Sequence, residues 1–337
     1  MIRHRLLAGA VVGLLTAVPG LPGTAAAGPP RGDGLRPCAL RPLPLPAGVA
    51  HGRATAVDPT GRYVAGIGTR ITDGVWEPAL LLWQGSRVTA VDTALAEEVV
   101  GVNSAGVVIG NAYVTATQRP WRYQGGRLTD LPVPGSVSGA WVTGINGRGD
   151  IVGYGAVEET ESTIPLRWPA DRPGTVATIG TPPDGAALAV LDDGTVVGSA
   201  RASAGSSSYA GWVLHPDGRL DRLTVPGRSN AWVLAARDGW AAGVTADDPD
   251  GQRHPVRWEL ATGRATVVDP AVQPVQDVTA GGVVLGLRAV WHPDGVTPLP
   301  GAVDGFPGVQ AQAIADTGTT VGWTTTDRLT PVRWTGC

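Results

Sequence analysis

A short strand bounded by glycines recurs seven times along this chain, and its regular spacing limits the folds that the chain can adopt. The first glycines of the seven segments are Gly61, Gly106, Gly149, Gly194, Gly239, Gly282 and Gly318. Successive first glycines lie 45, 43, 45, 45, 43 and 36 residues apart. Self-similarity at a nearly fixed period is the signature of a repeat architecture. The sequence therefore predicts seven equivalent structural units.

One of these units shows what each repeat contains. It holds an apolar run that ends in an aromatic residue (Pro120–Tyr123), a Leu-rich run (Leu128–Pro132), a run with small residues (Val142–Asn146) and a final apolar run (Ile151–Gly153). Turn residues separate these four strand-sized segments, and no amphipathic helix pattern is present. Seven such units predict an all-β fold, a seven-bladed β-propeller. A β-solenoid and a pair of β-sandwiches are the alternatives, although solenoid repeats are shorter and sandwiches would not produce this register.

The two ends of the chain complement each other in this scheme. The seventh unit stops at Trp334–Cys337, before its fourth strand. Near the other end, Leu40–Pro44 matches the fourth strand Leu128–Pro132 and belongs to no other unit. We therefore expect the N-terminal strand to close the last blade. Cys38 and Cys337 would then share one turn, within the distance that a disulfide bond requires.

The glycine segments also carry a recognisable motif. Gly101–Gly110 and Gly144–Gly153 both read Gly-apolar-Asn-x-x-Gly-x-apolar-apolar-Gly. With the Trp-ending and Leu-rich strands, this motif resembles the extracellular HAF-repeat proteins over nearly all of residues 40–337. The His-Ala-Phe triplet that names that family is absent, and Pro165–Trp168 and its equivalents stand in its place. The resemblance implies an extracellular repeat protein and brings no assigned reaction with it.

The first residues are typical of an export signal. Arg3 and Arg5 give a basic start, Leu6–Val18 an apolar core and Ala25–Ala27 a small-residue cleavage site. The apolar run is too short to span a membrane. We therefore predict a secretory signal peptide over residues 1–27 and an extracellular location.

The remaining chain is expected to comprise a flexible leader, residues 28–37, and the propeller, residues 38–337. The formal net charge of the whole chain is −3, and every basic residue other than His is Arg. A mildly acidic chain without a basic cluster argues against nucleic acid as a partner. The absence of Lys and the abundance of Ala, Gly and Pro indicate a GC-rich, bacterial source. We expect a monomer with no membrane partner.

No catalytic or metal-binding motif is present. The chain lacks the Gly-x-Ser-x-Gly nucleophile elbow, the His-Glu-x-x-His zinc motif and phosphate-binding loops. His215 and His292 lie in His-Pro-Asp-Gly runs, which are typical of turns. Asp247–Asp250 lacks the ligand spacing of a calcium loop and is expected to be a solvated acidic loop. The sequence thus predicts no catalytic residue, no metal site and no cofactor.

Aromatic and arginine residues recur in the third strand of the repeat. The aromatic residues are Trp83, Tyr123, Trp168, Trp258, Trp291 and Trp334, and arginines precede four of the aromatic positions at Arg122, Arg167, Arg257 and Arg333. Features repeated so often favour a structural role. We expect the aromatic rings to pack between blades, and the guanidinium groups to tie strands or blades through carboxylates or carbonyls.

The candidate binding residues come from their register in the repeat. The position two residues before the small residues of each innermost strand holds Arg53, Glu98, Trp141, Ala186, Trp232, Pro274 and Gln310. Five of these, Arg53, Glu98, Trp141, Trp232 and Gln310, are predicted to surround one mouth of the central channel and to stack and orient a ligand. Loops between the second and third strands would add Trp76, Tyr113, Tyr209 and Trp323. The alternative is that the two tryptophans only plug the channel.

Two classes of function fit these predictions. The first is a secreted binding or interaction module that uses one propeller face for a carbohydrate, peptide or protein ligand. The alternative is an extracellular hydrolase or lyase with its site at the channel mouth. An enzyme should bring His or paired carboxylates together near the axis, and the inner strands offer only Arg53, Glu98 and Asp277. We therefore predict a binding protein rather than an enzyme.

Overall fold

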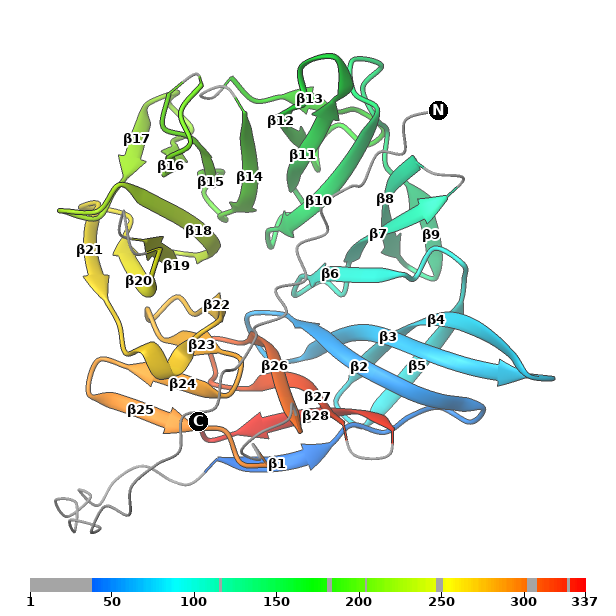
Figure 1. Cartoon of the computed structure of the whole chain (residues 1–337). Coiled ribbons are helices and arrows are strands. Elements are labelled where there is room, and N and C mark those ends of the chain that lie inside the picture. Colours follow the sequence, from blue (N-terminus) through cyan, green and yellow to red (C-terminus); the bar gives the residue numbers. More distant parts are fainter. Residues whose placement is uncertain are drawn as a thin grey trace, which may run out of the picture. The chain divides into compact units, whose positions relative to one another are not determined.

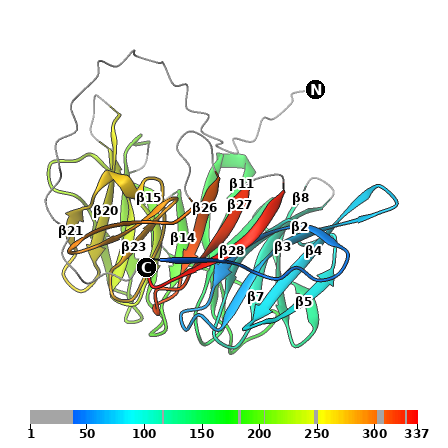
Figure 2. The ribbon, with the colours of Figure 1, turned by 90° about the horizontal axis from the view of Figure 1, so that it is seen from below.

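The computed structural model describes residues 38–114, 117–180, 184–203, 205–246, 251–301, 308–325 and 328–337, all within the compact unit Arg36–Cys337. These residues form seven four-stranded antiparallel sheets arranged in a ring (Figure 1). Figure 2, turned by 90°, shows the strands crossing the thickness of this ring. The predicted propeller is confirmed, while the predicted signal peptide and leader lie outside the described residues.

Within blades 1 to 6 the strands follow one another from the axis outward. Blade 1 contains β2 (Val49–Val57), β3 (Tyr63–Thr72), β4 (Val75–Gln84) and β5 (Arg87–Asp92). Blade 2 contains β6 (Glu98–Val102), β7 (Val108–Val114), β8 (Thr117–Gln124) and β9 (Arg127–Asp130). Blade 3 contains β10 (Gly139–Ile145), β11 (Ile151–Val157), β12 (Ser162–Trp168) and β13 (Ala177–Thr178), with the short 3-10 helix η1 (Glu158–Thr160).

The second half of the ring repeats this order. Blade 4 contains β14 (Gly185–Val190), β15 (Val196–Arg201), β16 (Tyr209–Leu214) and β17 (Leu220–Leu223). Blade 5 contains β18 (Asn230–Arg237), β19 (Trp240–Ala246), β20 (Arg253–Glu259) and β21 (Arg264–Val267). Blade 6 contains β22 (Val275–Val278), β23 (Val284–Gly286), β24 (Ala289–His292) and β25 (Gly295–Pro298), preceded by the 3-10 helix η2 (Pro270–Val272).

The seventh blade is built from both ends of the chain. It contains β26 (Val309–Ile314), β27 (Thr320–Thr325) and β28 (Leu329–Thr335), and its outer strand is β1 (Ala39–Pro42). Leu40 lies opposite Trp334 in the antiparallel register of β1 and β28. A disulfide bond joins Cys38 to Cys337, whose Cα atoms are 4.8 Å apart. The predicted closure and the predicted disulfide are therefore both confirmed.

The two glycines of each repeat meet different backbone requirements. The seven first glycines, from Gly61 to Gly318, all have φ between 74° and 96°, a conformation that favours glycine. The second glycine lies against the inner strand. At Gly66, Gly110, Gly153, Gly198, Gly243 and Gly322, an added Cβ atom would lie 1.8–2.1 Å from a carbonyl oxygen of that strand. Any side chain at the second position would therefore push the inner strand away.

Every inner strand has a β-bulge at the same place, and β2 has a second one at Ala50. The residue left unpaired at the shared register shift is Thr55, Val100, Thr143, Leu188, Leu234, Gln276 or Gln312. A bulge bends a strand and increases its local twist, which suits seven sheets converging on one axis. Each residue at the shared shift lines the central cavity.

Tryptophans of the third strands join neighbouring blades. The indole Nε1 atoms of Trp83, Trp168, Trp258 and Trp334 donate to the carbonyls of Pro44, Pro132, Thr224 and Pro300 at 2.7–3.0 Å. Each of these carbonyl groups belongs to a residue in the segment that follows the outer strand of the preceding blade. Blades 2 and 4 instead bury Trp121 and Trp212, two residues earlier in the strand. The predicted packing of the aromatic residues between blades is confirmed.

The recurring arginines are less uniform than the sequence predicts. Nη2 of Arg167 lies 3.4 Å from Oδ1 of Asp150, and Nη1 of Arg257 donates to the Gly282 carbonyl at 2.9 Å. These two arginines form the expected contacts. The side chains of Arg122 and Arg333 make no hydrogen bond or ion pair with any residue that the structure describes.

Candidate functional site

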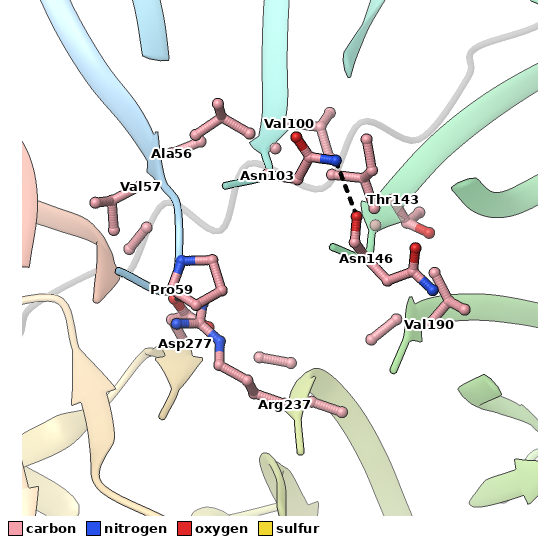
Figure 3. Close-up of a pocket in the computed structure, with 18 of the residues that line it drawn as sticks. Ala56, Val57, Pro59, Val100, Asn103, Thr143, Asn146, Val190, Arg237 and Asp277 are labelled. Atoms are coloured by element: carbon pink, nitrogen blue, oxygen red, sulfur yellow. Dashed lines mark hydrogen bonds and ion pairs between the residues drawn. The ribbon is translucent and has the colours of Figure 1, made fainter. Parts of the chain in front are cut away.

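The inner strands surround a central channel with two differently built mouths. We call the side on which these strands begin the start face, and the side on which they turn into the second strands the turn face. A cavity of about 450 Å³ occupies the channel toward the turn face. Figure 3 looks into it, with Val100, Thr143, Val190, Arg237 and Asp277 labelled around it. Its volume lies in the range of small-molecule sites.

A belt of hydrogen bonds between blades runs along the turn face. Nδ2 of Asn103 in blade 2 donates to the Asn146 carbonyl of blade 3 at 3.0 Å (Figure 3). Nδ2 of Asn146 donates in turn to the Leu191 carbonyl of blade 4, also at 3.0 Å. The side-chain oxygens of both asparagines accept backbone N–H groups of their own turns. These side chains thus fix the turns and the spacing of neighbouring blades together.

Asp58 occupies the same position in blade 1 and is fully buried. Its carboxylate accepts hydrogen bonds from the Tyr63 backbone at 2.6 Å, from Ser104 of blade 2 at 2.8 Å, and from the backbone and hydroxyl of Thr60. Burial acts to raise the pKa of Asp58, but the bonds from Thr60, Tyr63 and Ser104 outweigh it and hold the pKa below its ordinary value. The carboxylate is therefore a structural anion.

Arg237 occupies this position in blade 5 and reaches two further blades. Its Nη1 donates to the Ile314 carbonyl of blade 7 at 2.7 Å, and its Nη2 lies 3.2 Å from Oδ2 of Asp277 in blade 6. Asp316 lies 3.6 Å from the same guanidinium. Figure 3 shows the Arg237 side chain extending toward Asp277 within the cavity wall. One side chain thus links three consecutive blades.

The carboxylates around this mouth have altered acidity. Burial raises the pKa of Asp277, although Arg237 and the backbone N–H groups of Ile314 and Val278 counteract it. Burial also raises the pKa of Asp238, and the negative charges of Asp192 and its neighbours add to this effect. Oδ1 of Asp277 accepts the Val278 N–H and Oδ2 accepts the Ile314 N–H, so both of its oxygens are occupied.

Sequence reasoning missed this mouth, although a signal for it was present. The residue that ends each inner-strand segment is Asp58, Asn103, Asn146, Leu191, Arg237, Thr279 or Ala315. Four of the seven are charged or carry an amide side chain, which is unusual next to apolar strand residues. Polar residues at one repeated position that is buried must find partners, and neighbouring blades provide them here.

The five predicted binding residues lie toward the opposite, start face. Each is found two residues before the bulge residue of its strand. None of the five is fully buried. Among the described residues, no hydrogen bond, ion pair or ring contact joins one of them to another. They are therefore distributed around the channel and do not form a single cluster.

Each of the five residues has its own neighbours on the start face. The Arg53 guanidinium lies 5.5 Å from the ring centroid of Trp323 in blade 7, which lies opposite Gln310 in register. Trp141 stacks on Tyr154, with ring centroids 5.1 Å apart and planes inclined by 13°. Nδ2 of Asn111 donates to Glu98 at 2.8 Å.

Glu98 and Trp232 connect neighbouring blades on this face. Burial raises the pKa of Tyr154, and the Glu98 charge from the adjacent blade raises it further. Trp232 of blade 5 lies beside Tyr209 of blade 4, with ring centroids 5.8 Å apart. The Arg253 guanidinium is 5.9 Å from the Trp232 centroid. The start face therefore presents aromatic rings combined with separated charges.

Most of the other predicted aromatics of this face are also accessible. Trp76 is 65% exposed at the tip of the β3–β4 hairpin and stacks on His51, with centroids 5.6 Å apart. Tyr113 is 46% exposed, and its backbone N–H donates to Glu97. Trp323 is buried. Three of the four added aromatics, Trp76, Tyr113 and Tyr209, thus keep accessible surface.

The described part of the chain holds no group of three or more His, Cys, Asp and Glu residues arranged to bind a metal ion. The predicted acidic loop, Asp247–Asp250, lies outside the described residues. His215 sits in the expected turn, since its carbonyl accepts the Gly218 N–H at 2.9 Å. Within the described ranges, no helix has the length and apolar character to cross a bilayer. The disulfide bond is compatible with an exported protein.

Comparison with known proteins supports the fold alone. No protein-family model and no curated protein matches the chain, so the resemblance to HAF-repeat proteins stays a prediction. The β-propeller domain of the Trilobed protease from Pyrococcus furiosus, which has an open velcro topology, matches with a TM-score of 0.60 at 9% identity. That match covers 85% of this chain and 95% of the domain.

Two larger proteins match this chain over about half of their own length. Acylaminoacyl peptidase from Pyrococcus horikoshii matches with a TM-score of 0.54 at 10% identity, over 85% of this chain and 51% of that one. Puromycin hydrolase matches with a TM-score of 0.54 at 15% identity, over 85% and 52%. The chain thus spans about half the length of these two proteins. At such identities, a shared fold does not transfer an activity.

Proposed function

We propose that this chain is a secreted binding protein that takes a glycan at the start-face mouth of its central channel. The proposal rests on two pairs of aromatic rings at that mouth. Trp141 lies beside Tyr154, and Trp232 lies beside Tyr209. All four rings keep accessible surface. Aromatic planes offer large, rigid contact area at low entropic cost, which suits the flat apolar faces of sugar rings.

Polar groups at the same mouth can orient such a ligand. Glu98 is exposed and can accept hydrogen bonds from hydroxyl groups, while Arg53 and Gln310 can donate them. A few polar groups among aromatic surfaces is the usual composition of a small-ligand site. The Glu98 carboxylate and the Arg53 guanidinium lie in different blades. This arrangement favours binding of a ligand over transfer of a proton.

The alternative, an extracellular hydrolase or lyase, would need an acid and a base that converge at one mouth. Asp277 on the turn face has the raised pKa expected of a general acid. Its oxygens, however, accept N–H groups of Val278 and Ile314, and Arg237 pairs with it. These contacts support a structural role for Asp277, so we favour binding.

A glycan array followed by calorimetry on the best-bound glycan tests the proposal. Replacing Trp232→Ala should raise the Kd at least tenfold, equivalent to about 1.4 kcal/mol. Val267→Ala, an exposed change on the outer strand of the same blade, is the control and should leave the Kd unchanged. Failure of the wild-type protein to bind any glycan, or unaltered binding by both Trp232→Ala and Trp141→Ala, would contradict it.

A further inference from the structure

The four recurring arginines face different residues at one equivalent position. In each of their blades, one residue of the second strand pairs with the aromatic residue of the third strand. The equivalent position is the residue immediately before that second-strand residue. In blade 3 it holds Asp150, which pairs with Arg167 at 3.4 Å. In blade 5 it holds Trp240, whose ring centroid lies 4.1 Å from the Arg257 guanidinium. The repeat thus provides a carboxylate in one blade and a π-system in the other.

Blade 2 provides neither. The equivalent position holds Val107, which is buried and apolar. The Nε atoms of Arg122, Arg167 and Arg257 are all buried without a hydrogen-bond partner, but only Arg122 also lacks a described partner for its terminal nitrogens. A guanidinium that is partly removed from water and lacks a counterion is unfavourable unless an external acceptor compensates for it.

A cavity of about 290 Å³ lies between blades 2 and 3, and Arg122 forms part of its wall. The remaining wall combines apolar residues, among them Leu131, Pro132, Trp168 and Pro173, with the polar residues Thr129, Asp130 and Thr175. The indole N–H of Trp168 is already used by the Pro132 carbonyl at 2.8 Å. The cavity therefore combines one unsatisfied cation with flat and aliphatic surfaces.

We propose that this cavity binds a small organic carboxylate. The carboxylate pairs with the Arg122 guanidinium, whose planar fork matches two carboxylate oxygens. The apolar body lies against Trp168 and the prolines, and the volume suffices, since a 150 Å³ cavity already holds benzene. Asp130 also borders the cavity, but it forms an ion pair with Arg119, which compensates its charge.

This site is separate from the start-face mouth and does not depend on the function proposed for that mouth. A fully hydrated anion such as phosphate would gain nothing from the apolar wall, so the two parts of the proposal can be tested independently. The charge is tested by variants of Arg122, and the apolar body by the choice of anion.

Benzoate is the first probe, titrated into the full protein by calorimetry and by ligand-observed NMR. We expect saturable binding that weakens at least tenfold in Arg122→Gln. Arg127→Gln removes the same charge from an exposed position of the same blade and should change the Kd less than twofold. Benzylamine should not bind, and inorganic phosphate should bind at least tenfold more weakly than benzoate.

A second variant gives Arg122 a counterion that belongs to the protein itself. Val107→Asp places a carboxylate where blade 3 has Asp150, and Asn103 is available to support it as Asn146 supports Asp150. The Kd of this variant for benzoate should be at least tenfold higher than that of the wild type, although Arg122 is present. Val107→Leu should keep the wild-type Kd. Circular dichroism and melting curves establish that each variant is folded.

The proposal is overturned if the wild-type protein does not bind benzoate, or if folded Arg122→Gln and Val107→Asp bind it as tightly as wild type. Phosphate binding as tight as benzoate would overturn the assignment of an organic carboxylate. Loss of glycan binding at the start face is irrelevant to these outcomes, because the two mouths of the channel lie outside this cavity.

Discussion

The two faces of the propeller use similar polar residues in opposite ways. On the turn face, Asp58, Asn103, Asn146 and Arg237 direct their hydrogen bonds to neighbouring blades. On the start face, Glu98 and Arg53 keep exposed surface beside aromatic rings. The disulfide bond also lies on the turn face, where Cys337 approaches the turn residue Gly318.

This difference separates scaffold from binding surface. A polar group whose hydrogen bonds are all made inside the protein has little to offer a ligand, whereas an incompletely satisfied group can form new bonds. Changes on the turn face should therefore lower stability, and changes on the start face should alter binding with little cost in stability.

Removing the covalent link of blade 7 should cost the most. The bond between Cys38 and Cys337 closes a sequence separation of 299 residues, and the chain-entropy account gives about 5.7 kcal/mol for a loop of this length. Cys38→Ser/Cys337→Ser should lower the free energy of unfolding by this order in urea titrations. Reducing agent should lower the Tm of the wild type but not of the variant. An unchanged melting curve with confirmed free thiols would contradict this.

Arg237→Leu should have the next largest effect. It leaves Asp277, whose side chain is only 14% exposed, without its cation. We expect the free energy of unfolding to fall by about 3 kcal/mol. Arg172→Leu, which removes an arginine that is 70% exposed, should change stability by less than about 0.5 kcal/mol. Equal effects of the two variants in urea unfolding would show that the turn-face belt contributes no stability.

Asp58 should make stability depend on pH. Its pKa is lowered in the folded protein from the ordinary value of 3.8, so the unfolded state binds more protons at acidic pH. Its contribution is complete above the unfolded pKa and is lost as pH falls through the lower, folded pKa. Asp58→Asn should be about 2 kcal/mol less stable than wild type at pH 7. The difference should shrink steadily below pH 4 in urea unfolding, and a constant difference would refute the assignment.

The smallest effect on stability is expected on the start face. Trp141 is only partly buried and stacks on Tyr154 within its own blade. Trp141→Ala should lower the free energy of unfolding by about 1 kcal/mol. By contrast, Trp258→Ala, at a fully buried ring, should cost about 3–5 kcal/mol. If both cost the same in urea titrations, Trp141 is part of the core and only plugs the channel.

Much of the fold could be predicted because it depends on local rules repeated seven times. A positive φ at the first glycine and a backbone contact at the second are needed in each blade, so the glycine spacing displays the repeat directly. The closure of blade 7 followed from counting strands, and β1 at Ala39–Pro42 begins one residue before the predicted Leu40–Pro44. The even cysteine count indicated the covalent link.

The site was harder to predict, because its contacts join blades that are distant in sequence. Arg237 reaches Ile314 across 77 residues, and nothing in either local sequence indicates this bond. The repeat also hid differences between its copies. Arg122, Arg167, Arg257 and Arg333 look equivalent in sequence, yet Arg167 has a carboxylate, Arg257 two indole rings, and Arg122 neither. Such differences depend on the residue that faces each arginine.

The shared seventh blade means that the ring has no privileged starting point. Because the Cα atoms of Cys38 and Cys337 are only 4.8 Å apart, a single inserted residue could bridge them as ordinary peptide. The chain could then be opened elsewhere, for example between Gly125 and Gly126, an exposed turn. A circularly permuted protein of this kind would start in blade 2 and would exchange the sulfur bond for one more β-hairpin.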